Sequence, residues 1–322
     1  MAGGFGAASI RLQAVTGMVL ATSEYGRKNV QHMVESVNTD NLHRIVAFLT
    51  AINPPRTYDH PGSLNAVASF IEKEFSDYGY RPQEQIYTFR GETYRNILAS
   101  VGPEDAPRMI IGAHYDVCDE QPGADDNASA VAGLLELARL LTGESMPLRH
   151  RIDFAAYTLE EPPASFTECM GSYVHARFLR ETGVKVLGMI SLEMIGYFSD
   201  EPKSQSYPAG MPVATMPDVG NFIAVVGRPI DAGLVQEIAQ GLREASLPTE
   251  PLLALPEIPG VSFSDHWGFW KLGFTAAMIT DTAFYRNPHY HQTSDTIDTL
   301  DFPRMGQVVQ GLYLWLMERH TR

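Results

Sequence analysis

The chain has 322 residues, of which 44% are hydrophobic and 19% charged, an ordinary balance for a globular protein with a large core. Its formal net charge of −14 argues against a nucleic-acid partner, because proteins that bind nucleic acids usually present a basic surface. No apolar run approaches the roughly 20 residues needed to span a bilayer, so no membrane partner is expected.

The first 38 residues mix small and polar types without clear periodicity. They predict an arm or irregular helix (residues 1–38) ahead of a single domain that covers residues 39–322. Polar residues interrupt the one apolar stretch of this arm, so no signal peptide is predicted and a cytoplasmic location is expected. Cys118 and Cys169 are too few for a disulfide scaffold, and two free thiols are the favoured interpretation.

Strands and helices are expected to alternate along the rest of the chain. This alternation predicts an α/β fold with a mixed, mostly parallel central sheet that is flanked by helices on both faces. Residues 199–220 are rich in proline and glycine and predict a long ordered loop or lid. Helical spacing of apolar residues is found at 41–51, 61–78, 127–141, 171–181, 231–245 and 303–319, and strands are predicted at 96–101, 108–114, 152–158, 186–194, 222–226 and 274–279.

Four candidate site residues lie at or just past the ends of predicted strands, namely His114, Glu160, Glu161 and Glu193. In open α/β sheets, ligands bind beyond the carboxyl ends of the strands, so these side chains are expected to share one site. Each residue alone also has an ordinary explanation, such as a solvated turn or a strand that has reached solvent. The coincidence of all four at strand ends favours a functional site.

The chemistry of these residues is that of a metal centre. Asp116, two residues after His114, can hold the second ring nitrogen of an imidazole that binds metal. Glu160 and Glu161 are adjacent carboxylates, which repel each other unless a cation neutralises at least one. One of them can bind metal while its neighbour acts as general base.

Two loops offer further ligands. The segment 122–129, Pro-Gly-Ala-Asp-Asp-Asn-Ala-Ser, opens a predicted helix; one acid can cap that helix, and Asp125 can bridge two cations. The segment 287–296 contains His289 and His291, and chemistry alone leaves the choice between them open. Nitrogen and carboxylate ligands suit zinc. The His-Glu-x-x-His and Gly-x-Ser-x-Gly motifs of other hydrolases are absent from the sequence.

In this order, the motifs His-x-Asp, Gly-Ala-Asp-Asp-Asn-Ala-Ser, Glu-Glu, Glu-Met-Ile-Gly-Tyr, Ser-Asp-His and His-x-Thr-x-Asp-Thr resemble those of the bacterial leucyl aminopeptidase-type zinc peptidases, metallopeptidase family twenty-eight. The resemblance runs from about Ser63 to the C-terminal helix. The same superfamily includes glutamate carboxypeptidase, the transferrin receptor ectodomain and glutaminyl cyclases. The resemblance implies a three-layer sandwich of the zinc aminopeptidase/phosphorylase type and an exopeptidase that hydrolyses N-terminal peptide bonds.

The resemblance also implies two zinc ions per chain that share one bridging carboxylate. By position, one ion is expected on His114, Asp125 and Glu193, and the other on Asp125, Glu161 and His291. Asp125, the first of the adjacent acids, is therefore the predicted bridge. The expected substrate is a peptide with a free N-terminus.

The same resemblance assigns a general base, a residue that orients His114, and the histidine ligand of the second ion. It assigns the general base to Glu160 and the orientation of His114 to Asp116. It selects His291 rather than His289 as the ligand, because the motif that follows has the family's spacing.

The chain departs from the family pattern at two places. Glu193 stands where the family more often has aspartate, which can shift the metal preference toward manganese or cobalt. The segment 162–171 is longer than usual, so no preference for leucine is carried over. The alternatives are a glutaminyl cyclase-like acyltransferase with one zinc, a dipeptidase or carboxypeptidase, and a non-catalytic binding domain; the run Asp125-Asp126-Asn127 favours the hydrolase. The sequence leaves the oligomeric state open.

Overall fold

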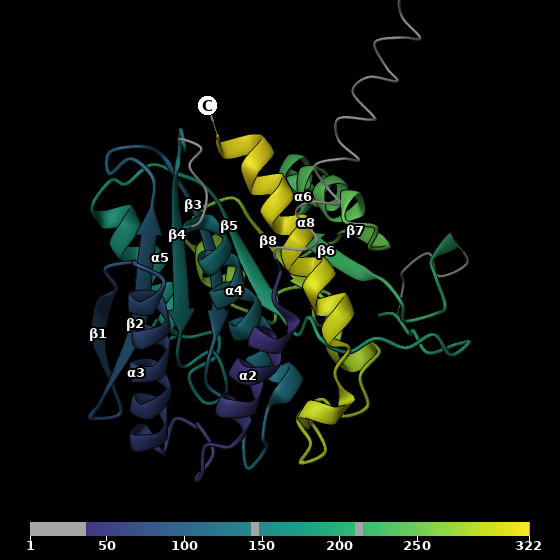
Figure 1. The fold of residues 1–322 in the computed structure, drawn as a ribbon, viewed down its shortest axis with the longest axis horizontal. Coiled ribbons are helices and arrows are strands. Elements are labelled where there is room, and N and C mark those ends of the chain that lie inside the picture. Colours follow the sequence, from purple (N-terminus) through teal and green to yellow (C-terminus); the bar gives the residue numbers. More distant parts are fainter. Residues whose placement is uncertain (1–36, 143–147, 210–214, 322) are drawn as a thin grey trace, which may run out of the picture. The chain divides into compact units, whose positions relative to one another are not determined.

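The computed structural model describes residues 37–142, 148–209 and 215–321 (Figure 1). The predicted N-terminal arm, residues 1–38, lies outside the described residues except for its last two. Eight strands form one sheet in the order β1-β2-β4-β3-β5-β8-β6-β7. The strands are β1 (Gln83–Phe89), β2 (Glu92–Val101), β3 (Arg108–His114), β4 (Arg151–Tyr157), β5 (Val186–Glu193), β6 (Ile223–Gly227), β7 (Thr249–Leu253) and β8 (Ala276–Thr280).

The central strands of the sheet are parallel, and an antiparallel pair joins them to the strands at each margin. Strands β4, β3, β5 and β8 run in the same direction. At one margin β2 pairs antiparallel with β4 and β1 with β2, and at the other β6 pairs antiparallel with β8. The predicted mixed, mostly parallel sheet is confirmed. Because the central strands are parallel, their carboxyl ends meet at one edge of the sheet.

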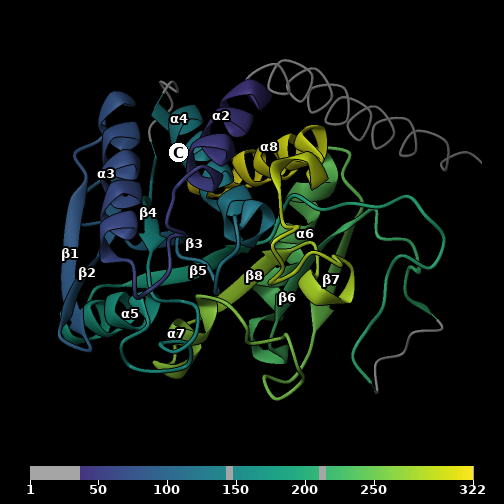
Figure 2. The same cartoon turned by 90° about the horizontal axis from the view of Figure 1, so that it is seen from below.

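Helices cover both faces of the sheet, as predicted. Figure 2 shows α5 and α7 on one face and α2, α3, α4, α6 and α8 on the other, which makes three layers. Helix α4 is buried on nearly all sides, because α2, α3, α8 and the sheet surround it. The helices are α2 (Thr39–Thr50), α3 (Pro61–Asp77), α4 (Ala130–Thr142), α5 (Gly171–Glu181), α6 (Ala232–Glu244), α7 (His266–Lys271) and α8 (Phe302–His320).

Local signals account for where several helices begin. The side chain of Asn38 accepts a hydrogen bond from the amide of Asn41 (3.0 Å) at the start of α2. The side chain of Asp301 accepts one from the amide of Arg304 (2.9 Å) at the start of α8. Pro61 begins α3, where the missing amide hydrogen of proline costs nothing. Within the described ranges, no helix is both long and apolar enough to cross a membrane.

The sequence-based predictions missed two strands and one α-helix of the described residues. Strand β1 is a margin strand whose exposed and half-buried residues alternate, so it has no strongly apolar face. Strand β7 contains a proline and no fully apolar run, and α7 is only six residues long. The helix predicted from residue 127 begins at Ala130, because residues 124–129 form an irregular turn. The described part of the predicted loop 199–220 contains no strand or α-helix.

Candidate metal centre

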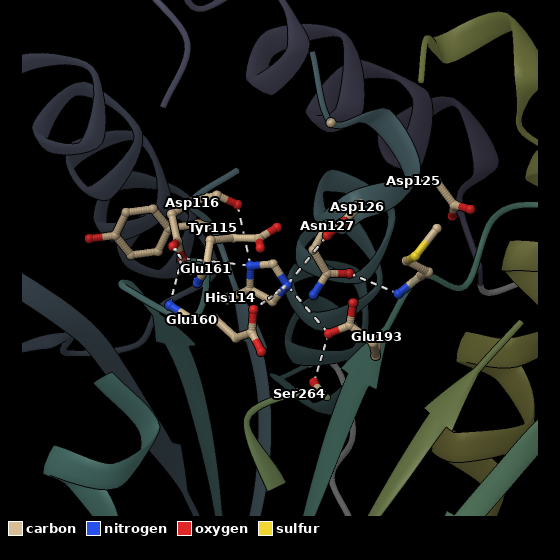
Figure 3. A network of polar contacts seen from close by, with 12 residues as sticks. His114, Tyr115, Asp116, Asp125, Asp126, Asn127, Glu160, Glu161, Glu193 and Ser264 are labelled. Carbon is tan, nitrogen blue, oxygen red and sulfur yellow. Dashed lines mark hydrogen bonds and ion pairs between the residues drawn. The ribbon is translucent and has the colours of Figure 1, made fainter. Parts of the chain in front are cut away.

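The predicted strand-end residues come together at the carboxyl edge of the sheet (Figure 3). His114 is the last residue of β3 and Glu193 the last residue of β5, while Glu160 and Glu161 follow β4. All four residues are buried, and His114 is 0% exposed. Since β3 lies between β4 and β5, the side chain of His114 lies between the carboxylates that these two strands supply.

His114 faces three carboxylates with one ring nitrogen. Its Nε2 lies 3.3 Å from Glu193 Oε2 and 3.6 Å from Asp126 Oδ1. Glu160 Oε2 is more distant, at 3.9 Å. The nitrogen of a single imidazole thus points into a cluster of oxygen atoms, as a metal ligand would.

His291 lies against the same cluster. Its Nε2 lies 3.2 Å from Asp126 Oδ2 and 3.4 Å from Glu161 Oε1. Asp126 therefore presents one oxygen to each histidine. The neighbouring His289 instead contacts the hydroxyl of Ser294 through Nδ1 (2.9 Å).

Asp126, and not the predicted bridge Asp125, lies between the two histidines. Figure 3 shows the carboxylate of Asp125 apart from the cluster. It accepts hydrogen bonds from the amide of Gly196 (2.9 Å) and from Asn287 Nδ2 (2.7 Å), so it joins three loops of the site. The turn 124–129 is non-helical at Asp126 and Asn127, and it directs adjacent carboxylates to different sides. Two neighbouring aspartates carry no sequence signal for which one faces the site.

Asp116 contacts His114, its predicted partner, and also holds Glu160 and Glu161. The ring Nδ1 of His114 lies 3.3 Å from the Asp116 carbonyl and 3.6 Å from Asp116 Oδ1. The same carboxylate accepts hydrogen bonds from the amides of Glu160 (3.2 Å) and Glu161 (3.0 Å). One aspartate thus holds the backbone from which both glutamates project.

Sequence reasoning missed the residues that hold the turn of Asp126. Asp295 accepts hydrogen bonds from the amides of Asp125 (2.9 Å) and Asp126 (3.1 Å). The side chain of Asn127 bonds the end of β5 twice, accepting from the amide of Met194 and donating to the carbonyl of Leu192. Both residues lie inside the recognised motifs, which was the only available signal for them.

A buried arginine joins this turn to the segment after β3. Arg56 is 2% exposed, and its guanidinium donates to the carbonyls of Tyr115 (2.9 Å), Pro122 (2.5 Å) and Gly123 (2.6 Å). Gly123 has a φ of +62°, and a Cβ there would meet the carbonyl of Asp126 at 2.3 Å. Glycine is therefore required at this position.

The carboxylates of the cluster are costly without a cation. Burial, with the nearby Asp126 adding to its effect, raises the pKa of Glu161 to about 7. Burial also raises the pKa of Glu160 well above that of an ordinary glutamate, with Glu161 and Glu193 adding to the effect against the opposing His114. Burial alone would lower the pKa of His114, but Glu193 and Glu160 outweigh it and raise that pKa. A divalent cation would stabilise the charged carboxylates.

The donor atoms fit divalent cations. Among the described residues, His114 Nε2, Asp126 Oδ1 and Glu161 Oε1 are buried and have no hydrogen-bond partner. Buried polar atoms are nearly always paired, so three that converge on one place call for a common partner. Imidazole nitrogen and carboxylate oxygen are the ligands that zinc, manganese and cobalt accept.

An apolar cleft opens beside the cluster. It borders Glu193 and Tyr290, is partly open to solvent, and holds about 710 Å³ of empty space with that open part included. Side chains from β6, β7, β8 and the loop after β8 form its walls. Its lining includes Val226, Leu252, Ala254, Met278 and Phe284.

Comparisons with known proteins agree with this geometry. A sequence profile described as peptidase family M28 matches residues 96–315. The chain is 44% identical over 282 residues to the uncharacterized protein YfbL of Escherichia coli, which covers 85% of this chain and 86% of that protein. It is 26% identical over 237 residues to the probable leucine aminopeptidase 1 of Trichophyton verrucosum, covering 69% of this chain and 57% of that protein.

Solved structures show the same fold. The LapA aminopeptidase of Legionella pneumophila superposes with a TM-score of 0.73 at 21% identity, covering 92% of this chain and 75% of that chain. The glutaminyl cyclase of Porphyromonas gingivalis gives a TM-score of 0.67 at 23% identity, covering 88% and 99% respectively. The predicted family and fold are confirmed. The match supports a peptidase, and the family is generally zinc-dependent. The chain belongs to peptidase family M28.

Proposed function

We propose that residues 39–322 form the catalytic domain of a zinc-dependent aminopeptidase, which removes the N-terminal residue of a peptide by hydrolysis. One observation carries this proposal. Asp126 lies between the two histidines with one oxygen toward each, in a cluster whose buried donor atoms lack hydrogen-bond partners among the described residues. A carboxylate between two imidazoles suits a pair of metal ions, as in co-catalytic hydrolytic sites.

Two sets of residues would hold the metal ions. His114, Glu193 and Asp126 would hold one, and His291, Glu161 and Asp126 the other. The Ser264 hydroxyl donates to Glu193 Oε2 (2.7 Å) and so fixes the longer side chain that stands where the family more often has aspartate. When bound, zinc polarises a carbonyl oxygen and lowers the pKa of water. Manganese and cobalt can supply the same chemistry.

Glu160 is the proposed general base. Asp116 holds its backbone amide, and Glu160 Oε2 lies 3.9 Å from His114 Nε2, at the margin of the cluster. From there its carboxylate takes a proton from the attacking water and returns it to the amine that leaves. This transfer requires Glu160 to be ionised before water attacks, and bound cations favour that state.

The apolar cleft is the proposed site for the side chain of the N-terminal residue. It borders Glu193, so a side chain in it would place the adjoining carbonyl at the metal centre. The α-amino group of the substrate is a cation, which the carboxylates of the centre would attract. The walls of the cleft are mainly apolar, and we therefore expect large apolar side chains to be preferred.

A panel of substrates tests this function. Leucyl, phenylalanyl and alanyl anilides would be assayed beside their N-acetylated forms and a peptide with N-terminal glutamine, with the bound zinc counted. We expect hydrolysis of the free anilides, fastest for the large apolar residues, and none of the acetylated ones. Cyclisation of the glutamine peptide without any hydrolysis would instead indicate a glutaminyl cyclase. No reaction of the zinc-loaded protein with any of these would contradict both enzymatic functions.

A further inference from the structure

A thiol lies next to one half of the proposed metal centre. Cys118 follows β3 by four residues, and it is only 9% exposed. Its sulfur, a carboxylate oxygen of Glu161 and a ring nitrogen of His291 all lie within 4.8 Å of one another. Such spacing allows the three atoms to contact a single metal ion.

A second observation points to a ligand at the same place. Glu161 is 5% exposed, and its Oε1 is buried without a hydrogen-bond partner in the described part of the chain. This oxygen lies 3.4 Å from Nε2 of His291. The three donors thus include one whose hydrogen-bonding capacity the protein itself leaves unused.

We propose that Cys118 supplies a thiolate ligand to the metal ion held by Glu161 and His291. This inference rests on the proposed function, since it requires a divalent cation in that position. On binding, the thiol loses its proton to solvent, and the sulfur forms a bond to the metal. The ion is then held by one sulfur, one imidazole nitrogen and carboxylate oxygens.

The two metal positions would consequently differ in chemistry. Among the residues that the structure describes, the donors grouped with His114 and Glu193 are nitrogen and oxygen only, because the thiol lies with the other group. Thiolate ligands favour zinc and cobalt, whereas carboxylate and water favour manganese and magnesium. The position beside Cys118 should therefore discriminate more strongly against manganese.

Cys169 offers a matched control. It is the only other cysteine of the chain, is partly exposed, and lies in the loop before α5. Among the described residues, it belongs to no group of three potential metal ligands. Serine at either position removes one sulfur with little change in volume.

Cobalt(II) is the probe that tests the proposal. A cobalt–thiolate bond absorbs in the near ultraviolet, and carboxylate and imidazole ligands do not produce that band. The metal-free full-length protein would be titrated with Co²⁺ as wild type, Cys118→Ser and Cys169→Ser. We expect the band in wild type and C169S, its loss in C118S, and a cobalt affinity at this position that is at least about tenfold weaker in C118S.

Thiol modification gives an independent readout. In C169S, Cys118 is the only thiol, so its reaction with a disulfide reagent can be followed alone. Saturating Zn²⁺ should slow that reaction, because the sulfur is bound. Cobalt binding with no band, together with an unchanged rate of thiol modification, would overturn the thiolate proposal and leave the metallopeptidase proposal standing. Failure of the protein to bind cobalt or zinc at all would overturn both.

Discussion

His114 and Glu193 reach the proposed metal centre from the last residues of buried parallel strands, whereas Asp126 and His291 reach it from loops. The strand-end residues are placed by the sheet itself, since β3 and β5 are neighbours in parallel register. The loop residues depend on a network of side chains. His291 even has a φ of +55°, a conformation that non-glycine residues adopt only where their surroundings hold them.

The comparison explains which parts of the site can be predicted from sequence. A strand-end ligand needs only a correct strand and a correct end, and the apolar runs before His114 and Glu193 supplied both. A loop ligand needs the backbone conformation of the loop. The prediction named Asp125 there, whereas Asp126 lies between the histidines, because the non-helical turn at Asp126 depends on distant partners such as Asp295.

The first prediction concerns Glu160, which belongs to the part of the site placed by the strand ends. Glu160→Gln keeps the shape of the side chain but removes the base, so kcat should fall by about 10²- to 10⁴-fold while the bound zinc is unchanged. Glu168→Gln, the same change at an exposed glutamate of the nearby loop, should leave kcat within about twofold. Kinetics on a leucyl anilide, with zinc measured by atomic absorption, would check this. Loss of zinc from E160Q would place Glu160 among the ligands instead.

A matched pair of substitutions tests the loop half. Asp126→Asn replaces the carboxylate between the two histidines by a neutral amide. Zinc affinity should therefore fall by more than about 100-fold at both positions. Asp125→Asn should retain both ions within about tenfold, because Asp125 supports the loops without facing either histidine. Isothermal titration with Zn²⁺ would measure the two variants. A larger loss in D125N than in D126N would reverse the assignment.

Acid stability probes the packing behind the strand ends. His175 on α5 is fully buried against the hydroxyl of Tyr157, and burial lowers its pKa to about 4. The unfolded chain binds this proton near pH 6.5, so folding is favoured above that pH and loses stability as the pH falls toward 4. The loss from this group would reach about 3 kcal/mol. His175→Gln should flatten this part of the curve of unfolding free energy against pH, measured with urea; an unchanged curve would exclude His175.

The smallest expected effect concerns the cleft formed by the second half of the chain. Ala254→Phe would occupy part of the apolar cleft, at a position remote in sequence from every proposed ligand. We expect kcat/KM for phenylalanyl anilide to fall by about 10- to 100-fold and that for alanyl anilide to change little. Equal losses for both substrates would mean that the cleft does not select the N-terminal side chain.

The fold was more predictable than the site. Periodicity identified most helices and the central strands, since these elements bury strong apolar patterns. The margin strands β1 and β7 were not predicted, because β1 is half exposed and β7 contains Pro251. The choice of His291 over His289 required the family motif. The two histidines of this loop have the same chemistry, and only the loop conformation decides which one faces the site.

A crystal structure of the zinc-loaded protein, with anomalous scattering measured at the zinc absorption edge, tests the central claim most directly. We expect two anomalous peaks per chain, one beside His114 and Glu193 and the other beside Glu161 and His291, with a different oxygen of Asp126 next to each. A single peak, or two peaks that flank Asp125 instead, would contradict the account.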